Sequence, residues 1–279
     1  MPNHLVLVRH GMSEGNVANQ MAREGNYDAF NAEFYERPGR DWRLVEVGVD
    51  QAKEAGLWIG KFILGAYPEL EDGFDIYYTS PHARTRETAG HLAIAGAEWR
   101  KERRIRERDW GDIETMNKTE WPDKFPDNYR KRQIDPLYWQ PPGGESIAQV
   151  ADTRVRAMNN TLRQRVERGL SSAIYVTHGE YIWAEFLDKE RMGHEEWDIA
   201  EADASRRIKN CQIIHFTRLD PETGEQAPVL AWVRSVTPWE TPDNPGQWRE
   251  IDYKKYSNQE LLAEVAAIRP LDLPGAQQS

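Results

Sequence analysis

Histidine and arginine residues gather where three short apolar runs of this 279-residue sequence end. Arg9 and His10 end the first run. Arg84 lies just beyond the second run, and His178 ends the third. A guanidinium group is always charged and its planar fork matches two phosphate oxygens, while a neutral imidazole can attack phosphorus near its ordinary pKa of about 6.5. With a second, protonated imidazole to stabilise the equatorial oxygens, this set favours phosphoryl transfer.

The formal net charge of −10 makes these arginines conspicuous. An acidic surface excludes a general nucleic-acid binder, which needs a basic stripe, and it repels an anionic substrate at long range. A phosphate ester therefore requires positive charge concentrated at one place. The single cysteine, Cys211, excludes an intramolecular disulfide and a cysteine-based zinc site.

Short apolar runs predict buried strands, and apolar residues at helical spacing predict helices between them. The strands are expected over 4–8, 74–79 and 173–177, and the helices over 48–65, 83–95, 145–168 and from about 180. This alternation predicts a three-layer α/β/α sandwich with a mostly parallel central sheet. Ligands gather outside the carboxyl ends of the strands in such a sheet, so the histidines and arginines are expected in one crevice.

A turn at 220–224 between two β-rich segments, 210–218 and 228–236, predicts an antiparallel hairpin at the sheet edge. The charged segment 103–106 is interpreted as a short strand near an edge.

The rest of the chain is interpreted as additions to a single domain spanning 1–279. Residues 17–43 and 109–144 are expected to be lid-type insertions, and about 237–279 a C-terminal extension. Within that extension, a capping-box pattern at Ser257 predicts one last short helix that ends near Pro270.

The residues around His10 resemble a known family signature. The segment Leu7-Val-Arg9-His10-Gly11-Met-Ser13-Glu-Gly-Asn16 is similar to that of the histidine phosphatase superfamily, which includes cofactor-dependent phosphoglycerate mutases. Five further segments match in the family's order: Leu44-x-x-x-Gly48-x-x-Gln51-Ala52, Ser80-Pro81-x-x-Arg84-Thr-x-x-Thr88-Ala89, Glu107-x-x-x-Gly111, Gly143-Gly-Glu145-Ser146 and Val176-Thr177-His178-Gly179. One tripeptide would be a weak signal, but the ordered set is highly specific.

The resemblance implies that His10 is a nucleophile that forms a phosphohistidine, with His178 as the second histidine. Arg9 and Arg84 are implied as phosphate ligands that act in catalysis. Further phosphate contacts are expected from residues near the two histidines: Ser13, Asn16 and Gly179. Ser13 and Asn16 are equally suited to capping a helix.

Glu107 is implied as the general acid, which protonates the leaving alcohol and then accepts a proton from water. This role requires a pKa above that of an exposed glutamate, through burial or nearby negative charge. Asp109 and Asp112 are close in sequence and remain rivals.

We predict a phosphatase that hydrolyses a small phosphorylated metabolite, without a metal or another cofactor. A cofactor-dependent phosphoglycerate mutase is the alternative, and the basic cluster 130–132 fits its substrate-carboxylate clamp. Glu180 counts against a mutase, because mutases usually carry asparagine there and a carboxylate disfavours an anionic phosphoglycerate. A non-catalytic binding protein is a third alternative, but such a protein typically loses one of the catalytic residues.

No apolar run approaches the roughly 18 residues that span a membrane, and no signal-peptide pattern opens the sequence. We therefore expect a cytoplasmic protein without membrane or nucleic-acid partners. A homodimer is left open by the Trp- and Pro-rich segment around 238–256.

Overall fold

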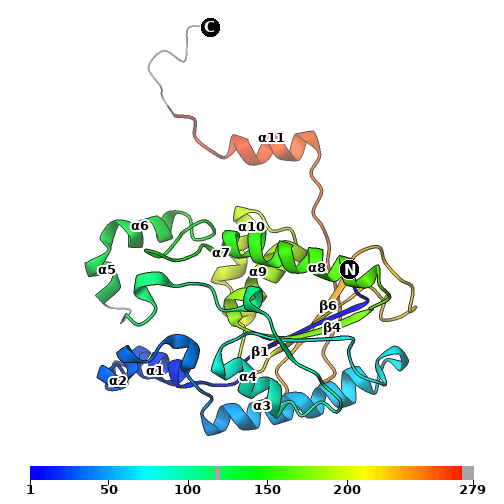
Figure 1. Ribbon diagram of the computed structural model, residues 1–279. Helices are drawn as coiled ribbons and strands as arrows, with labels where there is room; N and C mark the ends of the chain where they lie inside the picture. The colour runs from blue at the N-terminus through cyan, green and yellow to red at the C-terminus, as the bar shows by residue number, and fades with distance from the viewer. Residues whose placement is uncertain (117–119, 272–279) are drawn as a thin grey trace.

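A seven-stranded sheet lies at the centre of the computed structural model, which describes residues 1–116 and 120–271 (Figure 1). The strands follow the order β3-β2-β4-β1-β5-β6-β7 across the sheet. They span His4–Arg9 (β1), Ile76–Thr79 (β2), Arg100–Lys101 (β3), Ser172–Thr177 (β4), Ile213–Thr217 (β5), Trp232–Val236 (β6) and Arg249–Glu250 (β7). The strands expected over 4–8, 74–79 and 173–177 are thus confirmed as β1, β2 and β4.

The sheet is mixed, so the expectation of a mostly parallel sheet is wrong. The pairings β3–β2, β2–β4 and β4–β1 are parallel, whereas β1–β5, β5–β6 and β6–β7 are antiparallel. The predicted hairpin is confirmed as β5 and β6, with β7 on its outer side. Because β5 runs antiparallel to β1, with Ile213 opposite Val8, the loop before β5 lies beside the carboxyl end of β1.

Helices cover both faces of the sheet, which confirms the three-layer α/β/α sandwich (Figure 1). Alternate residues of β1 point to opposite faces. Leu5 and Leu7 pack in one core with the helices α7 to α9, while Val6 and Val8 pack in the other core with α3. The helices span Glu14–Arg23 (α1), Ala32–Glu36 (α2), Glu46–Ile59 (α3), Ala83–His91 (α4), Glu120–Lys124 (α5), Pro126–Ile134 (α6), Ile147–Gln149 (α7), Arg156–Val166 (α8), Gly179–Lys189 (α9), His194–Ala202 (α10) and Asn258–Ala266 (α11).

Two predicted helices contain a π-helical turn. A turn over Gly60–Leu64 extends α3, and one over Val150–Val155 joins α7 to α8. The strand expected over 103–106 is wrong, since Arg103–Ile105 is a 3-10 helix and the edge strand β3 lies just before it. The alternating charged residues there carried too little apolar pattern to locate a two-residue strand.

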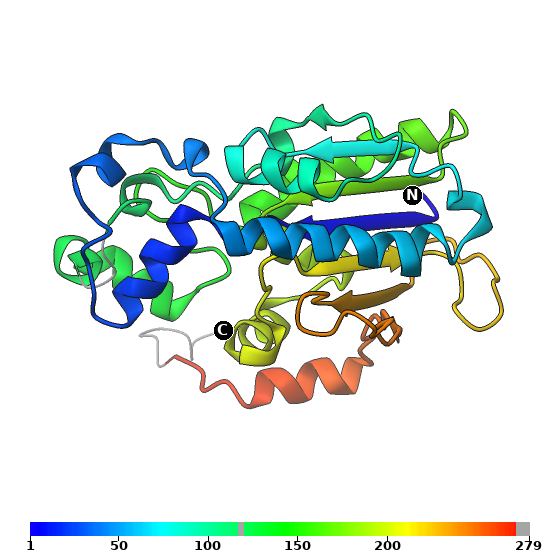
Figure 2. The ribbon, with the colours of Figure 1, turned by 90° about the horizontal axis from the view of Figure 1, so that it is seen from below.

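The two predicted insertions lie at the same end of the molecule. In Figure 2, α1 and α2 from the first insertion and α5 and α6 from the second gather on the left, beyond the carboxyl end of β1. Side chains from both segments line one pocket. Their position beside the strand ends makes them the walls of the candidate site.

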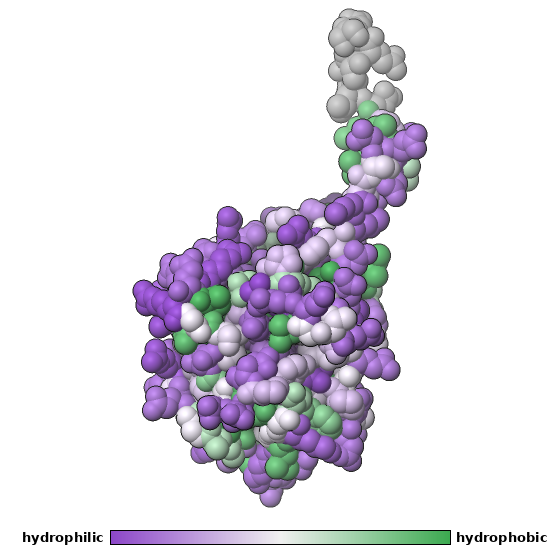
Figure 3. All heavy atoms as spheres, turned by 90° about the vertical axis from the view of Figure 1, so that its right-hand side faces the viewer, coloured by the Kyte–Doolittle hydropathy of each residue, from purple (hydrophilic) through white to green (hydrophobic). Residues whose placement is uncertain are grey.

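The C-terminal extension divides into a packed part and a projecting part. Trp58 donates a hydrogen bond from Nε1 to the carbonyl of Asn244 (2.8 Å), and Ile251 is buried. The helix α11 has the predicted capping box, with Ser257 as its N-cap, and stands away from the body (Figures 1 and 3). Over the described residues, none of the helices has the length and apolar character needed to cross a bilayer.

Candidate active site

His10 lies buried in the loop that follows β1, and its ring is fixed in one tautomer. Its Nδ1 is 2.7 Å from the carbonyl oxygen of Gly11, which only accepts, so Nδ1 carries the proton. The Nε2 lone pair accepts a hydrogen bond from Nε of Arg84 at 3.2 Å. Burial and the charges of Arg84 and Arg9 hold the pKa of His10 well below its ordinary value. The ring is therefore neutral at neutral pH, with Nε2 available as a nucleophile.

Arg84, at the start of α4, connects both histidines. Its Nη1 donates to the carbonyl of Gly39 (2.7 Å), and its Nη2 lies 3.2 Å from Nδ1 of His178. A guanidinium only donates, so Nδ1 of His178 accepts and Nε2 donates to the Ser80 hydroxyl at 2.8 Å.

His178 is therefore neutral in the free site. Burial and the charge of Arg84 hold its pKa well below the ordinary value. The expectation of a protonated second imidazole is wrong for this state, because two guanidinium groups already occupy the site. His82 packs against His178 with ring centroids 4.7 Å apart, and burial followed by the charge of Arg84 lowers its pKa to about 3.

Arg9 offers a free donor to the site. Its Nη1 donates to the carbonyl of Ile208 (2.7 Å), while its Nε is buried and has no hydrogen-bond partner among the residues described. A side-chain carbon at Gly179 would lie 3.5 Å from this Nε, so the glycine leaves its approach open. An unpaired buried guanidinium nitrogen is costly, and a bound anion would satisfy it.

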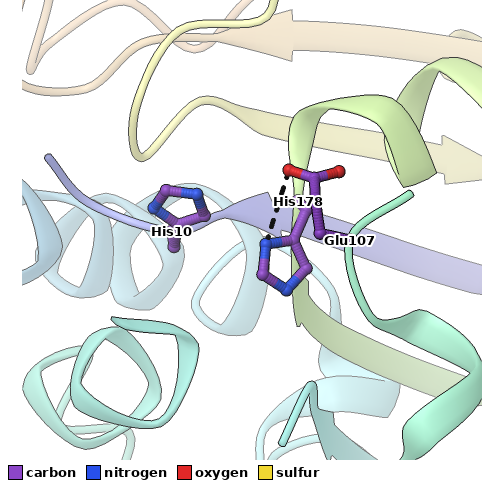
Figure 4. Close-up of side chains that lie close together, drawn as sticks. All are labelled: His10, Glu107 and His178. Atoms are coloured by element: carbon purple, nitrogen blue, oxygen red, sulfur yellow. Dashed lines mark ion pairs between the residues drawn. The ribbon is translucent and has the colours of Figure 1, made fainter. Parts of the chain in front are cut away.

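Glu107 reaches the histidines from the loop after the 3-10 helix Arg103–Ile105. Figure 4 shows its carboxylate beside the ring of His178, and Oε2 lies 3.7 Å from Nδ1 of that ring. The side chain of Glu107 is only 18% exposed. Burial raises the pKa of Glu107, and the carboxylate of Glu180 raises it further. This direction is the one that a general acid requires.

The two rivals of Glu107 lie elsewhere. Asp109 has a half-exposed side chain that accepts a hydrogen bond from the backbone of Gly111 (2.9 Å), and Asp112 is exposed. Neither lines the pocket that contains His10.

A network of charged residues holds Glu107 in place. Glu145, from the fourth matching segment, pairs with Arg106 (3.1 Å) and Arg154 (3.4 Å). Arg108 donates from Nε to the carbonyl of Glu145 (2.7 Å) and pairs through Nη1 with Glu180 (3.0 Å). Glu180 thus lies close enough to Glu107 for its charge to raise the pKa of Glu107.

The remaining motif residues support the loop that carries His10. Gln51 accepts a hydrogen bond from the backbone of Met12 (2.9 Å), and Thr88 accepts one from that of Gly11 (3.0 Å). A side-chain carbon at Gly48 would lie 2.1 Å from the carbonyl oxygen of Met12, so α3 approaches the loop too closely for any larger residue. Contacts with the backbone of the loop that carries His10 therefore explain the residue types at Gly48, Gln51 and Thr88.

We expect Gly48→Ala to lower the free energy of unfolding by about 1–3 kcal/mol, because the added carbon collides with backbone. The displaced loop also moves His10, so activity should fall together with stability. Gly90→Ala is the control, since nothing lies within 4 Å of the added carbon in α4 and a helical alanine is about 0.5–1 kcal/mol better than glycine. Urea unfolding of both variants checks this, and a Gly48→Ala protein as stable as the parent would contradict it.

Ser13 and Asn16 form the capping box of α1. Asn210, which sequence reasoning did not single out, donates from Nδ2 to the carbonyl of His10 and to Oδ1 of Asn16, both at 3.0 Å. Ser13 and Asn16 both line the pocket. Capping α1 is therefore compatible with the contacts that we expect them to make with phosphate.

His10, Glu107 and His178 also lie close enough to be considered as metal ligands. One potential ligand atom from each falls within 4.8 Å of the others. However, Arg84 contacts both histidines and the charge of Arg9 acts on His10, so the surroundings are positive. A cation would be repelled there, whereas an anion would be attracted.

The site opens into a pocket of about 850 Å³. Its polar side contains the residues described above, and its other walls are largely aromatic and apolar. These walls include Trp42, Trp110, Ile113, Met116, Trp121, Tyr129 and Trp183.

The basic cluster 130–132 is only partly in this pocket. Arg132 lines the pocket, whereas Arg130 and Lys131 are exposed outside it. Trp139 lines a smaller neighbouring pocket of about 190 Å³.

This arrangement of a neutral buried histidine, two guanidinium groups and a carboxyl with a raised pKa is chemically suited to phosphoryl transfer. The family model described as histidine phosphatase superfamily (branch 1) matches residues 5–217. The chain therefore belongs to the histidine phosphatase superfamily.

Curated relatives include 2,3-bisphosphoglycerate-dependent phosphoglycerate mutases. That of Parvibaculum lavamentivorans is 28% identical over 205 residues, which are 70% of this chain and 84% of the relative. That of Methylobacterium radiotolerans is 30% identical over 192 residues, which are 66% of this chain and 77% of the relative.

Solved structures with the same fold include phosphatases. A mycobacterial glucosyl-3-phosphoglycerate phosphatase in complex with VO3 has a TM-score of 0.58 at 20% identity, covering 90% of this chain and 98% of that one. A mutant phosphoserine phosphatase from Entamoeba histolytica in complex with phosphoserine has a TM-score of 0.57 at 21% identity, covering 77% and 90%. At these identities the likeness concerns the fold alone.

Proposed function

We propose that the protein is a metal-independent phosphomonoesterase that works through a phosphohistidine on His10. The observation that carries this proposal is the fixed tautomer of His10, whose Nε2 lone pair faces Arg84 in a buried, anion-attracting site. The substrate is a small phosphorylated metabolite whose organic part occupies the aromatic pocket.

In the first step, Nε2 of His10 attacks phosphorus and the bond to the ester oxygen breaks. Glu107, protonated because its pKa is raised, gives its proton to the leaving oxygen. Arg9 and Arg84 balance the charge on the three equatorial oxygens. In the second step Glu107 takes a proton from water as that water attacks phosphorus, the bond to Nε2 breaks, and inorganic phosphate leaves.

Hydrolysis is favoured over mutase activity by the position of Glu180. Its carboxylate lines the pocket and pairs with Arg108. Arg108 lines only the smaller neighbouring pocket, so the Glu180 carboxylate presents negative charge to the pocket that contains His10, which disfavours the carboxylate of a phosphoglycerate there. The mutase remains the second candidate because of the named relatives, and because Arg132 lines the pocket.

A panel of phosphorylated metabolites separates the two reactions. It includes para-nitrophenyl phosphate and 3-phosphoglycerate with a trace of 2,3-bisphosphoglycerate, and free phosphate and isomer formation are scored separately. We expect phosphate release without isomer formation, unchanged by EDTA. Isomer formation that exceeds phosphate release would establish the mutase, and loss of turnover in EDTA would refute the metal-independent mechanism.

We expect Glu180→Gln to move the alkaline limb of the activity profile to lower pH. The Glu180 carboxylate raises the pKa of Glu107, so its removal lowers that pKa and the acid form is lost earlier as pH rises. The profile of kcat/KM is measured with an alkyl phosphate, whose leaving oxygen needs a proton. Glu54→Gln, an exposed change of the same charge on α3, should leave the limb in place. An unmoved limb in Glu180→Gln would show that Glu107 does not set it.

A further inference from the structure

The pocket contains three arginines that phosphoryl transfer does not use, and one of them, Arg132, pairs with Glu201 at 3.8 Å. The other two are Arg23 and Arg207. Arg23 lies in the last turn of α1, and Arg207 follows the 3-10 helix Ala204–Arg206 in the loop before β5. Both line the same pocket as His10. Neither has a carboxylate partner among the residues described, although most arginines around Glu107 do.

These two arginines extend the positive charge of the catalytic centre outward. Burial and the charges of Arg84 and Arg207 lower the pKa of Arg9, and burial and the charge of Arg207 lower the pKa of Arg23. Arg207 is therefore close enough to both Arg9 and Arg23 for its charge to act on them, and all three line the pocket. Arg23 and Arg207 are both exposed, and in a chain with a formal charge of −10 their position at one pocket together with Arg9 and Arg84 favours an anionic ligand.

The helix α1 allows the length of this side of the pocket to be estimated. Asn16, Gln20 and Arg23 are spaced at helical periods and all line the pocket, so one polar face of α1 runs along it. Asn16 lies at the catalytic end, where Asn210 joins it to His10. The seven residues from Asn16 to Arg23 advance about 10 Å at 1.5 Å per residue.

We propose that Arg23 and Arg207 bind a second anionic group of the substrate, a carboxylate or a second phosphate, toward the end of α1 that is farther from the transferred phosphoryl group. The proposal rests on the proposed phosphatase function and specifies its substrate class. The advance of about 10 Å along α1 favours a substrate longer than a three-carbon phosphoglycerate, with two anionic ends. The pocket of about 850 Å³ accommodates such a molecule.

Non-hydrolysable alkylphosphonates test the subsite without depending on turnover. Three series of increasing chain length carry a methyl group, a carboxylate or a second phosphonate at the far end. Their affinities for the whole protein are measured by isothermal titration calorimetry. We expect a far-end anion to tighten binding about tenfold over the methyl compound, with a maximum at an intermediate length. The better of the two anionic series identifies the second group as carboxylate or phosphate.

Arg23→Gln and Arg207→Gln should each remove most of this gain and leave the affinity of the methyl series within about twofold. Arg168→Gln, an exposed arginine outside the pocket, is the control for net charge and should behave as the parent. The subsite is refuted if the far-end anion gives no gain, if the gain is independent of chain length, or if it persists in the double variant.

The same samples keep this proposal separate from the proposed function. Hydrolysis of para-nitrophenyl phosphate is assayed in parallel for every variant, because this substrate lacks a second anionic group. Hydrolysis with no gain in calorimetry refutes the subsite alone. A length-dependent gain without any hydrolysis refutes the phosphatase and leaves the subsite supported.

Discussion

His10→Ala should lower the steady-state hydrolysis of phosphate monoesters by about 10⁴-fold or more, the loss typical of a deleted nucleophile. The neighbouring rings cannot replace it, because neither His178 nor His82 lines the pocket. Phosphate release from para-nitrophenyl phosphate measures the loss. His194→Ala, an exposed histidine on α10, is the matched control and should retain full activity.

The covalent intermediate gives this prediction a second readout. Protein quenched during turnover should carry a phosphoryl group that is labile in acid and stable in alkali, as a phosphoramidate is. Intact mass and peptide mapping should place it on His10 in the parent and find none in His10→Ala. Thermal unfolding shows whether the variant is folded. Substantial turnover by a folded His10→Ala protein, or a phosphoryl group on another residue, would eliminate the mechanism.

Glu107→Gln should produce the second largest effect, and the effect should depend on the leaving group. For alkyl phosphates, we expect a loss of about 10²–10⁴-fold, since the leaving oxygen needs a proton and a glutamine cannot supply one. Para-nitrophenolate leaves without a proton, so the first turnover of para-nitrophenyl phosphate should be nearly unchanged. Attack of water on phospho-His10 still needs a base, so the second step should be slow.

Stopped-flow absorbance with para-nitrophenyl phosphate resolves the two steps. The parent should show steady turnover, whereas Glu107→Gln should show a burst of about one nitrophenolate per active site followed by a slow phase. Asp109→Asn is the control, because its half-exposed carboxylate lies outside the pocket. Equal losses in the first turnover with alkyl and nitrophenyl esters would show that Glu107 does not protonate the leaving oxygen. The absence of a slow second phase would show that it does not activate water. A loss in Asp109→Asn instead would move the role to that residue.

The sequence was informative where function depends on local pattern. The apolar runs located β1, β2 and β4, and the polar residues after them are gathered at one end of the sheet. The ordered motifs extended this to Glu107, whose position in an irregular loop has no periodicity to reveal it. They also marked Gly48 and Gln51, although only the structure shows that these residues support the loop carrying His10.

The direction of β5 was the main feature that local pattern did not reveal. Parallel and antiparallel strands show the same alternation of apolar residues. The sequence therefore did not predict that β5 pairs with β1 or in which direction it runs. Because β5 runs antiparallel to β1, its preceding loop brings Asn210 to His10 and Arg207 into the pocket. Both residues were missed for this reason, and no spacing in the sequence connects them to His10.

Protonation was likewise decided by tertiary contacts. Residue types predicted that a histidine would attack and a glutamate would donate a proton, because these are properties of the side chains. The neutral state of His178, the tautomer of His10 and the effect of Glu180 on Glu107 depend on burial and on charges distant in the sequence. The sequence by itself thus determined which groups could react at His10. Only the tertiary structure decided which of them carry protons, because desolvation and charge–charge interactions exist only once the chain has folded.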